Sequence, residues 1–367
     1  MPPDILKEIL YENPYYSRYS VGVKEWEKGG NVIRYSDKQL PFENPVIASP
    51  SNNRYISSGG RSILIDDPGC PKKLKGIDPT GYVHKIYTKM KGDSIEGMDT
   101  EDQMLYVTDE VLLSLMGVKK GEHSLLKDGT LGRHDDSPFG VLTLKQARNE
   151  KMVLDILKSA YSDYGYLPSQ DPLAIYVFND LDFDSGKTAS ILTELPVSIG
   201  SDLRLRELHF FVRKKYLELD RSESGYDSKV NDMMALYEQI YRWIGFEARL
   251  FFDNNLKPVP RSFSSMNFCV RYMNDEMDVG ISRVDHGSTE IGGEVTKEFF
   301  FSILKNQVDV FHPLLSKVHD PVAHGIDVEC ENMMFAQYFD DGWNGIVEPL
   351  NPYLEAVLAP QQHLEQI

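Results

Sequence analysis

The chain has 367 residues, of which 41% are hydrophobic and 26% are charged, and it contains no apolar run long enough to cross a bilayer. This length is sufficient for two lobes or domains, each with its own core. The formal net charge of -17 disfavours broad binding to nucleic acid or to an anionic membrane, because a polyanion is repelled unless basic residues are segregated on one face. We therefore expect neither a nucleic-acid partner nor a membrane partner.

The N-terminal residues and the cysteines point to one compartment. The first eight residues lack the basic flank and the apolar stretch of a signal peptide. The chain has three cysteines, which are too few for a disulfide framework. These features predict a cytoplasmic protein.

The first third of the chain is typical of short strands separated by turns. Residues 45–49 and 61–66 are apolar or alternating segments, and the Ser, Asn, Pro and Gly residues between them favour turns. We expect a strand, a turn that contains Gly59 and Gly60, and a second strand. Residues 93–136 are charged and interrupted by glycines, and we interpret them as an insertion.

A helix and two strands are predicted next. Residues 143–157 carry an apolar stripe near helical spacing, which predicts a helix. Residues 173–178 and 190–197 have the composition of strands, and the aspartates between them predict a turn at 180–186.

Helices dominate the remainder of the chain. Periodicity predicts helices at 205–219 and 230–244, the second ending at Gly245 as a C-terminal cap. This order of elements is that of an α+β, two-lobed protein-kinase-like fold. The β-rich N-lobe would comprise residues 1–199, and the mainly helical C-lobe residues 200–367.

Chemically suitable residues occur at matching places in this order. Transfer of a phosphoryl or nucleotidyl group needs a cation on the phosphates and an acidic residue that holds the cation. Lys75 follows the Gly turn and can supply the cation. Glu150, on the first long helix, can supply its partner, as the third-strand Lys and the helix Glu do in kinases.

Oxygen ligands for Mg²⁺ are predicted in the second half of the chain. Asn267 stands directly before an apolar strand, and Asp285 follows another in the sequence Val-Asp-His-Gly. Protein kinases hold two Mg²⁺ ions with an Asn and the Asp of an Asp-x-Gly motif. This arrangement predicts a metal site formed by Asn267 and Asp285.

Five short stretches together resemble one family. Residues 74–82, Leu-Lys-Gly-Ile-Asp-Pro-Thr-Gly-Tyr, resemble the Leu-Lys-Gly-Ala-Gly-x-Thr-Pro-Tyr run of the selenoprotein O family. Residues 149–152 resemble its Ser-Glu-Ala-Met helix start, and residues 197–205 its Val-Ala-Pro-Ser-x-Ile-Arg-Phe segment. Residues 243–246 resemble the segment that ends in Gly-Phe before its catalytic loop, and residues 284–287 its Ile-Asp-Tyr-Gly. Members of this family have a kinase fold and transfer AMP from ATP onto protein hydroxyl groups.

The resemblance implies ATP and Mg²⁺ as cofactors and a protein as substrate. It also implies a role for each candidate residue. These are Lys75 and Glu150 at the phosphates, Gly59 and Gly60 in the phosphate-binding turn, Arg204 at the distal phosphates, and Asn267 and Asp285 at the metal.

The chain departs from the family at the catalytic loop. Met266 precedes Asn267 where the family has an Asp, and Ser262 stands where ordinary kinases have their base, so no catalytic Asp is aligned. Residues 253–255, Asp-Asn-Asn, are a shifted alternative, although residues 256–260 after them are typical of a hairpin turn.

Three other interpretations stay open. The chain could transfer the γ-phosphoryl group as a kinase, or bind nucleotide without catalysis as a scaffold. The candidate residues also have structural readings, such as a charged edge strand around Lys75, an exposed helix residue at Glu150 and an ordinary turn at Asp285. An unrelated α+β module would follow if those readings held.

Overall fold

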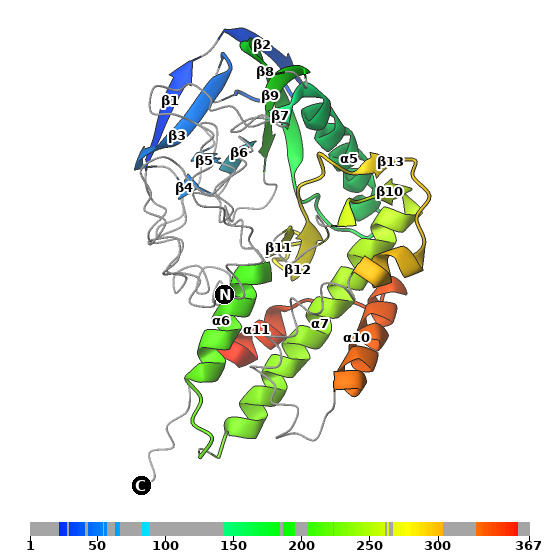
Figure 1. The fold of residues 1–367 in the computed structure, drawn as a ribbon. Helices are drawn as coiled ribbons and strands as arrows, with labels where there is room; N and C mark the ends of the chain where they lie inside the picture. Colours follow the sequence, from blue (N-terminus) through cyan, green and yellow to red (C-terminus); the bar gives the residue numbers. More distant parts are fainter. Residues whose placement is uncertain are drawn as a thin grey trace. The chain divides into compact units, whose positions relative to one another are not determined.

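The computed structural model contains helices and antiparallel sheets, which confirms the predicted α+β class (Figure 1). It describes residues 22–27, 29–40, 43–53, 55–56, 63–66, 83–87, 142–183, 186–194, 205–222, 224–260, 263, 267–303 and 328–358.

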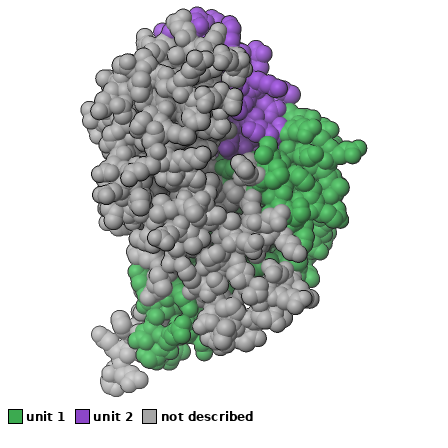
Figure 2. All heavy atoms as spheres, in the orientation of Figure 1, with its two compact units in different colours: residues 1–9, 203–284, 290–367 green, residues 10–202, 285–289 purple. Residues whose placement is uncertain are grey.

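The chain divides into two compact units (Figure 2). We call residues 10–202 together with 285–289 the sheet unit, and residues 1–9, 203–284 and 290–367 the helical unit. Residues 285–289 thus belong to a different unit from the residues that flank them.

The sheet unit is built around one antiparallel sheet. Its described strands follow the order β2-β8-β9-β6-β5-β4, and β7 pairs with β9 beside this path. They are β2 (Gly30–Arg34), β4 (Tyr55–Ile56), β5 (Ile63–Asp66), β6 (Val83–Tyr87), β7 (Leu142–Thr143), β8 (Asp171–Phe183) and β9 (Gly186–Glu194).

Two strands predicted in the first third of the chain are present but do not pair with each other. β3 (Val46–Asn53) pairs with β1 (Gly22–Glu27) in a separate two-stranded sheet, whereas β5 pairs with β4 and β6. β3 also continues through its two asparagines, because the pairing with β1 reaches Asn53. Local turn preference is overridden there by the ladder.

The β8–β9 hairpin is longer than the sequence predicts. The predicted turn at 180–186 is wrong over most of its length, because β8 continues to Phe183 and β9 begins at Gly186. A register shift between Val177 and Asp182 lets the polar residues extend the ladder.

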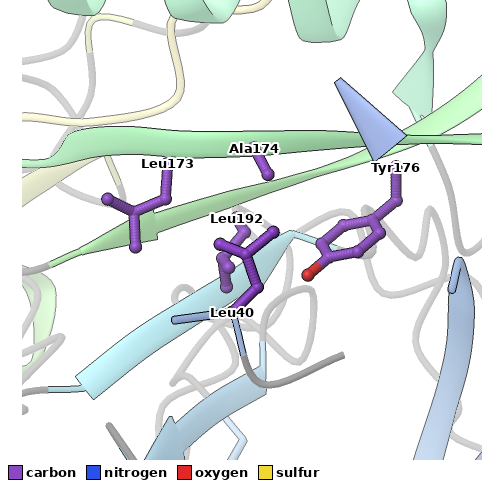
Figure 3. Packing of buried hydrophobic residues seen from close by; sticks show 5 residues of the cluster. All are labelled: Leu40, Leu173, Ala174, Tyr176 and Leu192. Atoms are coloured by element: carbon purple, nitrogen blue, oxygen red, sulfur yellow. The ribbon is translucent and has the colours of Figure 1, made fainter. Parts of the chain in front are cut away.

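Apolar residues alternate across this sheet, so both faces are covered. Ile175, Val177 and Ile191 pack with Ala147 of α5 (Leu144–Ser162), the helix that precedes β8 in the chain. The opposite face carries a second cluster, to which Leu40 contributes from outside the strands (Figure 3). Its members are Leu40, Leu173, Ala174, Tyr176 and Leu192.

The helix predicted at 143–157 is confirmed as α5 (Leu144–Ser162). It begins with a capping box: the Thr143 hydroxyl accepts from the Gln146 backbone N–H, and the Gln146 side chain accepts from the Thr143 N–H. The cap fixes the start of the helix, and its apolar stripe, which includes Ala147, Val153 and Leu157, is buried.

The helical unit is organised around one long helix, α7 (Tyr226–Asp253), which is contacted by α10 (Val328–Trp343) and α11 (Asn351–Leu358). α6 (Leu205–Leu217) precedes it. The predicted stop at Gly245 is wrong, since α7 continues for two more turns. A Cβ on Gly245 would lie 2.1 Å from the Phe339 carbonyl oxygen of α10, so the glycine permits a close helix crossing.

Two short antiparallel ladders follow α7. β11 (Phe268–Tyr272) pairs with β12 (Val279–Arg283), as the two apolar segments predict. β10 (Leu256–Lys257) pairs with β13 (Glu290–Ile291). The hairpin turn predicted at 256–260 is therefore wrong at its start, where strand pairing takes over.

Aromatic side chains fill the core of the helical unit. The Trp243 ring meets Phe246 edge to face at 5.6 Å between centroids, and its indole N–H donates to the Glu348 carbonyl at 2.8 Å. Phe263 meets Phe268 in the same geometry at 5.0 Å. Such pairs add directional stabilisation to the burial of large apolar surfaces.

One polar pair is also enclosed by this core. His209 Nδ1 of α6 and the Tyr237 hydroxyl of α7 lie 3.2 Å apart, and the rings stack at 5.2 Å. Burial lowers the pKa of His209 to about 3 and raises the pKa of Tyr237. The imidazole is therefore neutral at ordinary pH.

In the part of the chain that the structure describes, no helix combines the length and the apolar composition needed to span a membrane.

Candidate functional site

Helix α5 brings two adjacent polar residues into the sheet unit. Glu150 is 1% exposed, although it lies on a helix whose other carboxylate, Asp155, is exposed. Charged side chains are rarely this buried unless they have a specific role or partner. The structural reading of Glu150 as an exposed helix residue is therefore wrong.

Asn149, the neighbour of Glu150, holds a turn formed by residues 285–289. Its side-chain Nδ2 donates to the carbonyl oxygen of Thr289 at 2.7 Å and to those of His286 and Gly287 at 3.3 Å. The turn is closed by a hydrogen bond of 2.9 Å from the Thr289 N–H to the His286 carbonyl. One amide group thus fixes a backbone segment that is up to 140 residues away in sequence.

Glu150 touches the same turn at its glycine. A Cβ on Gly287 would lie 3.2 Å from Glu150 Oε2 and 3.5 Å from the Gln146 carbonyl oxygen. These separations leave little room for a side chain, so glycine allows the turn to lie against the helix. The predicted site residue Glu150 therefore lies against the turn that begins with Asp285, another predicted site residue.

Asp285 occupies the first position of this turn. Its backbone φ is +66°, in the left-handed region that Asp enters more readily than most residues. The residue is partly exposed, whereas His286 is buried. Asp285 is therefore accessible to solvent, and its backbone has an uncommon conformation.

The other predicted metal ligand, Asn267, lies in the helical unit directly before β11. Its carbonyl oxygen accepts a hydrogen bond of 2.8 Å from the N–H of Val284, which continues the β11–β12 ladder by one step. Asn267 and Val284 therefore lie side by side at the open end of the hairpin. Asp285 is the next residue in the chain.

A buried carboxylate that sequence reasoning did not single out fixes the end of β12. Glu247 of α7 is fully buried and accepts a hydrogen bond of 3.1 Å from the backbone N–H of Arg283. The Arg283 side chain is also fully buried, with its guanidinium 5.0 Å from the centre of the Phe251 ring. The sequence signal that could have identified Glu247 is an acidic residue within an otherwise apolar stretch of α7.

A second missed carboxylate lies at the end of β9. Glu194 is 5% exposed, and the Lys38 ammonium binds both its oxygens, Oε1 at 2.6 Å and Oε2 at 2.5 Å. Lys38 follows β2 in the chain, so this pair fastens the segment after β2 to the centre of the sheet. Its long sequence separation explains why no local pattern predicts it.

Four predicted site residues lie outside the described residues: Gly59, Gly60, Lys75 and Arg204. Their assigned roles stay predictions, as does the proximity of Lys75 to Glu150.

Among the described residues, no group of three or more His, Cys, Asp or Glu side chains is arranged to hold a metal ion. No protein-family model matches this chain, and the curated protein sequences yield no significant match.

Proposed function

We infer that this chain is an ATP- and Mg²⁺-dependent transferase with a two-lobed protein-kinase-like fold, which transfers AMP from ATP onto protein hydroxyl groups. The observation that supports this most is the packing of Glu150 against Gly287. In kinases the helix Glu and the Asp of the Asp-x-Gly motif serve the same bound nucleotide. Glu150 and Asp285, which lies two residues before Gly287, were predicted for nucleotide chemistry from separate stretches of sequence.

The donor set suits the proposed metal. Asp285 offers a carboxylate and Asn267 an amide oxygen, and hard oxygen donors of this kind are what Mg²⁺ prefers. Bound with ATP, Mg²⁺ would neutralise charge on the phosphates. In this proposal Asp285 and Asn267 hold the metal, while Asn149 and Glu247 position the segments on which those ligands stand.

The remaining roles follow from the sequence resemblance. Lys75 neutralises phosphate charge, Glu150 positions Lys75, Gly59 and Gly60 cover the phosphates, and Arg204 binds the distal phosphate oxygens. In the reaction, the substrate hydroxyl oxygen forms a bond to the α-phosphorus and the bond to the bridging oxygen of the β-phosphate breaks, so pyrophosphate leaves. The hydroxyl proton passes to solvent, since loose transition states of this kind need little base catalysis.

The test is incubation of the full chain with Mg²⁺ and ATP labelled separately on the α and γ phosphates. We expect α label on protein and release of pyrophosphate by the wild type, and loss of both in Lys75→Ala and Asp285→Ala. Asp275→Ala is the matched control, because Asp275 is an exposed residue at the far end of the β11–β12 hairpin. It should keep full activity.

Other outcomes point to the alternatives. Transfer of γ label alone would identify a kinase and contradict AMP transfer. Absence of transfer, with ATP still raising the melting temperature, would identify a nucleotide-binding scaffold, an alternative favoured by Met266 at the position of the family's Asp.

A further inference from the structure

A basic hollow lies beside the N-terminal half of α5, next to the start of β9. Its volume is about 460 Å³, within the range of ligand pockets. It is lined by Thr143, Leu144, Lys145, Arg148, Asn149, Met152 and Lys187. All these residues belong to the sheet unit, and no acidic side chain is among them.

The cations at this hollow differ from the others on the same helix. Lys151 pairs with Asp155, and Lys158 pairs with Asp171. Within the described part of the chain, neither Lys145 nor Arg148 has a carboxylate partner, and the same holds for Lys187 of β9. Three unpaired cations around one hollow are notable in a chain whose net charge is -17.

These cations do not stabilise the helix on which two of them stand. Lys145 lies in the first turn of α5 and Arg148 in the second, and the first turn contains no acidic residue. Positive charges near a helix N-terminus oppose the helix dipole. Their placement therefore carries a small cost to folding that an anionic ligand would offset.

The hollow also has an apolar component. Leu144 and Met152 line it, and the Met152 side chain is 50% exposed, among the most exposed large hydrophobic residues described. Lys145, Arg148 and Met152 follow one another at spacings of three and four, so they form one stripe along the helix. Methionine adapts its shape readily to a partner side chain.

We propose that this hollow is a docking site for an acidic segment of a partner protein, in which carboxylates flank an apolar side chain. Charge complementarity supplies the attraction, and Leu144 and Met152 receive the apolar side chain. At physiological ionic strength charges are screened beyond about 8 Å, so the three local cations outweigh the acidic remainder of the surface. A nucleic acid fits less well, because its charge continues along its length over that acidic remainder.

The test uses the full chain and a fluorescein-labelled peptide, Glu-Glu-Leu-Glu-Glu, with binding followed by fluorescence anisotropy. We expect saturable binding that weakens about tenfold in the double variant Lys145→Glu/Arg148→Glu and severalfold in Lys187→Glu. Lys158→Glu is the control, on the same helix as Lys145 and Arg148 and matched in charge to Lys187→Glu, and it should bind the peptide within about twofold of the wild type. Replacing the peptide leucine by serine should weaken binding further.

The contrary results are distinct. Equal binding by the wild type and the double variant would overturn the proposal, and so would an equal loss in Lys158→Glu. Tighter binding of a single-stranded oligonucleotide than of the peptide would assign the hollow to nucleic acid instead. Competition by inorganic phosphate at equal concentration would assign it to a small anion. Melting temperatures of all variants within about 2 °C of the wild type would show that folding is not the cause of any loss.

Discussion

The core of the helical unit and the turn at residues 285–289 are held by opposite means. Around α7, aromatic rings such as Trp243 and Phe251 pack edge to face and are almost fully buried. The turn is held by polar groups of α5, with Asn149 binding three carbonyls and Glu150 lying against Gly287. Apolar packing stabilises without direction, whereas hydrogen bonds of this kind fix position at a cost in desolvation. The difference indicates that the contacts of the turn fix the position of residues 285–289 more than they add to the stability of the fold.

The largest expected effect on stability belongs to the aromatic core. Trp243→Ala should lower the free energy of unfolding by about 3–5 kcal/mol, because it leaves a cavity and an unpaired Glu348 carbonyl. Phe301→Ala, at a residue that is 37% exposed, should cost less than about 1 kcal/mol. Urea unfolding followed by circular dichroism measures both, and equal losses would contradict the assignment of the core to α7.

Asn149→Ala should lower the free energy of unfolding less than Trp243→Ala does, and it should reduce label transfer from ATP more. Loss of its hydrogen bonds to the turn is worth about 1–3 kcal/mol in unfolding free energy. If the turn is built for placement, transfer of label from ATP should fall at least tenfold.

Asn254→Ala is the control for Asn149→Ala, since the Asn254 amide also donates to a backbone carbonyl, that of Leu250, at 2.8 Å. A similar loss of label transfer in both variants would show that α5 has no special relation to the site.

The enclosed His209 predicts how the helical unit responds to acid. Its folded pKa of about 3 lies below the ordinary value of 6.5, so the unfolded chain binds a proton that the folded chain excludes. Stability from this group is complete above pH 6.5 and is lost as the pH falls towards 3, by about 1.4 kcal/mol per pH unit. Relative to the wild type, His209→Phe should show a shallower fall in unfolding free energy between pH 6.5 and 4.5. Parallel curves would contradict burial of a neutral imidazole.

Gly287→Ala tests the contact between the turn and Glu150 with the smallest expected change in stability. The new Cβ would lie 3.2 Å from Glu150 Oε2, so that the carboxylate or the turn must shift by a few tenths of an ångström. We expect a loss of about 1 kcal/mol or less, with a measurable fall in label transfer. Gly225, the N-cap of α7, has a φ of -96° and nothing within 4 Å, so the same substitution there should cost only the small loss of a glycine N-cap and leave label transfer unchanged. Equal behaviour at the two positions would remove the argument for a close contact.

Local sequence signals predict which helices and strands form better than they predict where these elements begin and end. The α5 helix is predictable because its apolar stripe and the Thr143–Gln146 capping box lie within a few residues of one another. The end of α7 is not, because Gly245 serves a crossing with α10 that no local pattern reveals. The turn predicted at 180–186 fails for the same reason, since pairing across the hairpin decides it.

The sequence singles out two residues near the turn at 285–289 but not the groups that hold this turn. Glu150 and Asp285 stand out as residue types at suitable places along the chain. Asn149 does not, because its partners are backbone carbonyls far away in sequence, and a side chain that binds backbone leaves no complementary residue to recognise. The Lys38–Glu194 pair is hidden in the same way.

The most direct test of the central claim is the effect of ATP with Mg²⁺ on the melting temperature of the full chain and of two isosteric variants. The wild type and Asp275→Asn should be stabilised equally, by about 2.7 kcal/mol at a nucleotide concentration 100 times the Kd. Asp285→Asn should lose most of this stabilisation, taken as the shift from its own melting temperature without ligand. The same ATP-dependent shift in Asp285→Asn as in the wild type, or no shift in any of the three proteins, would contradict a nucleotide site at this turn.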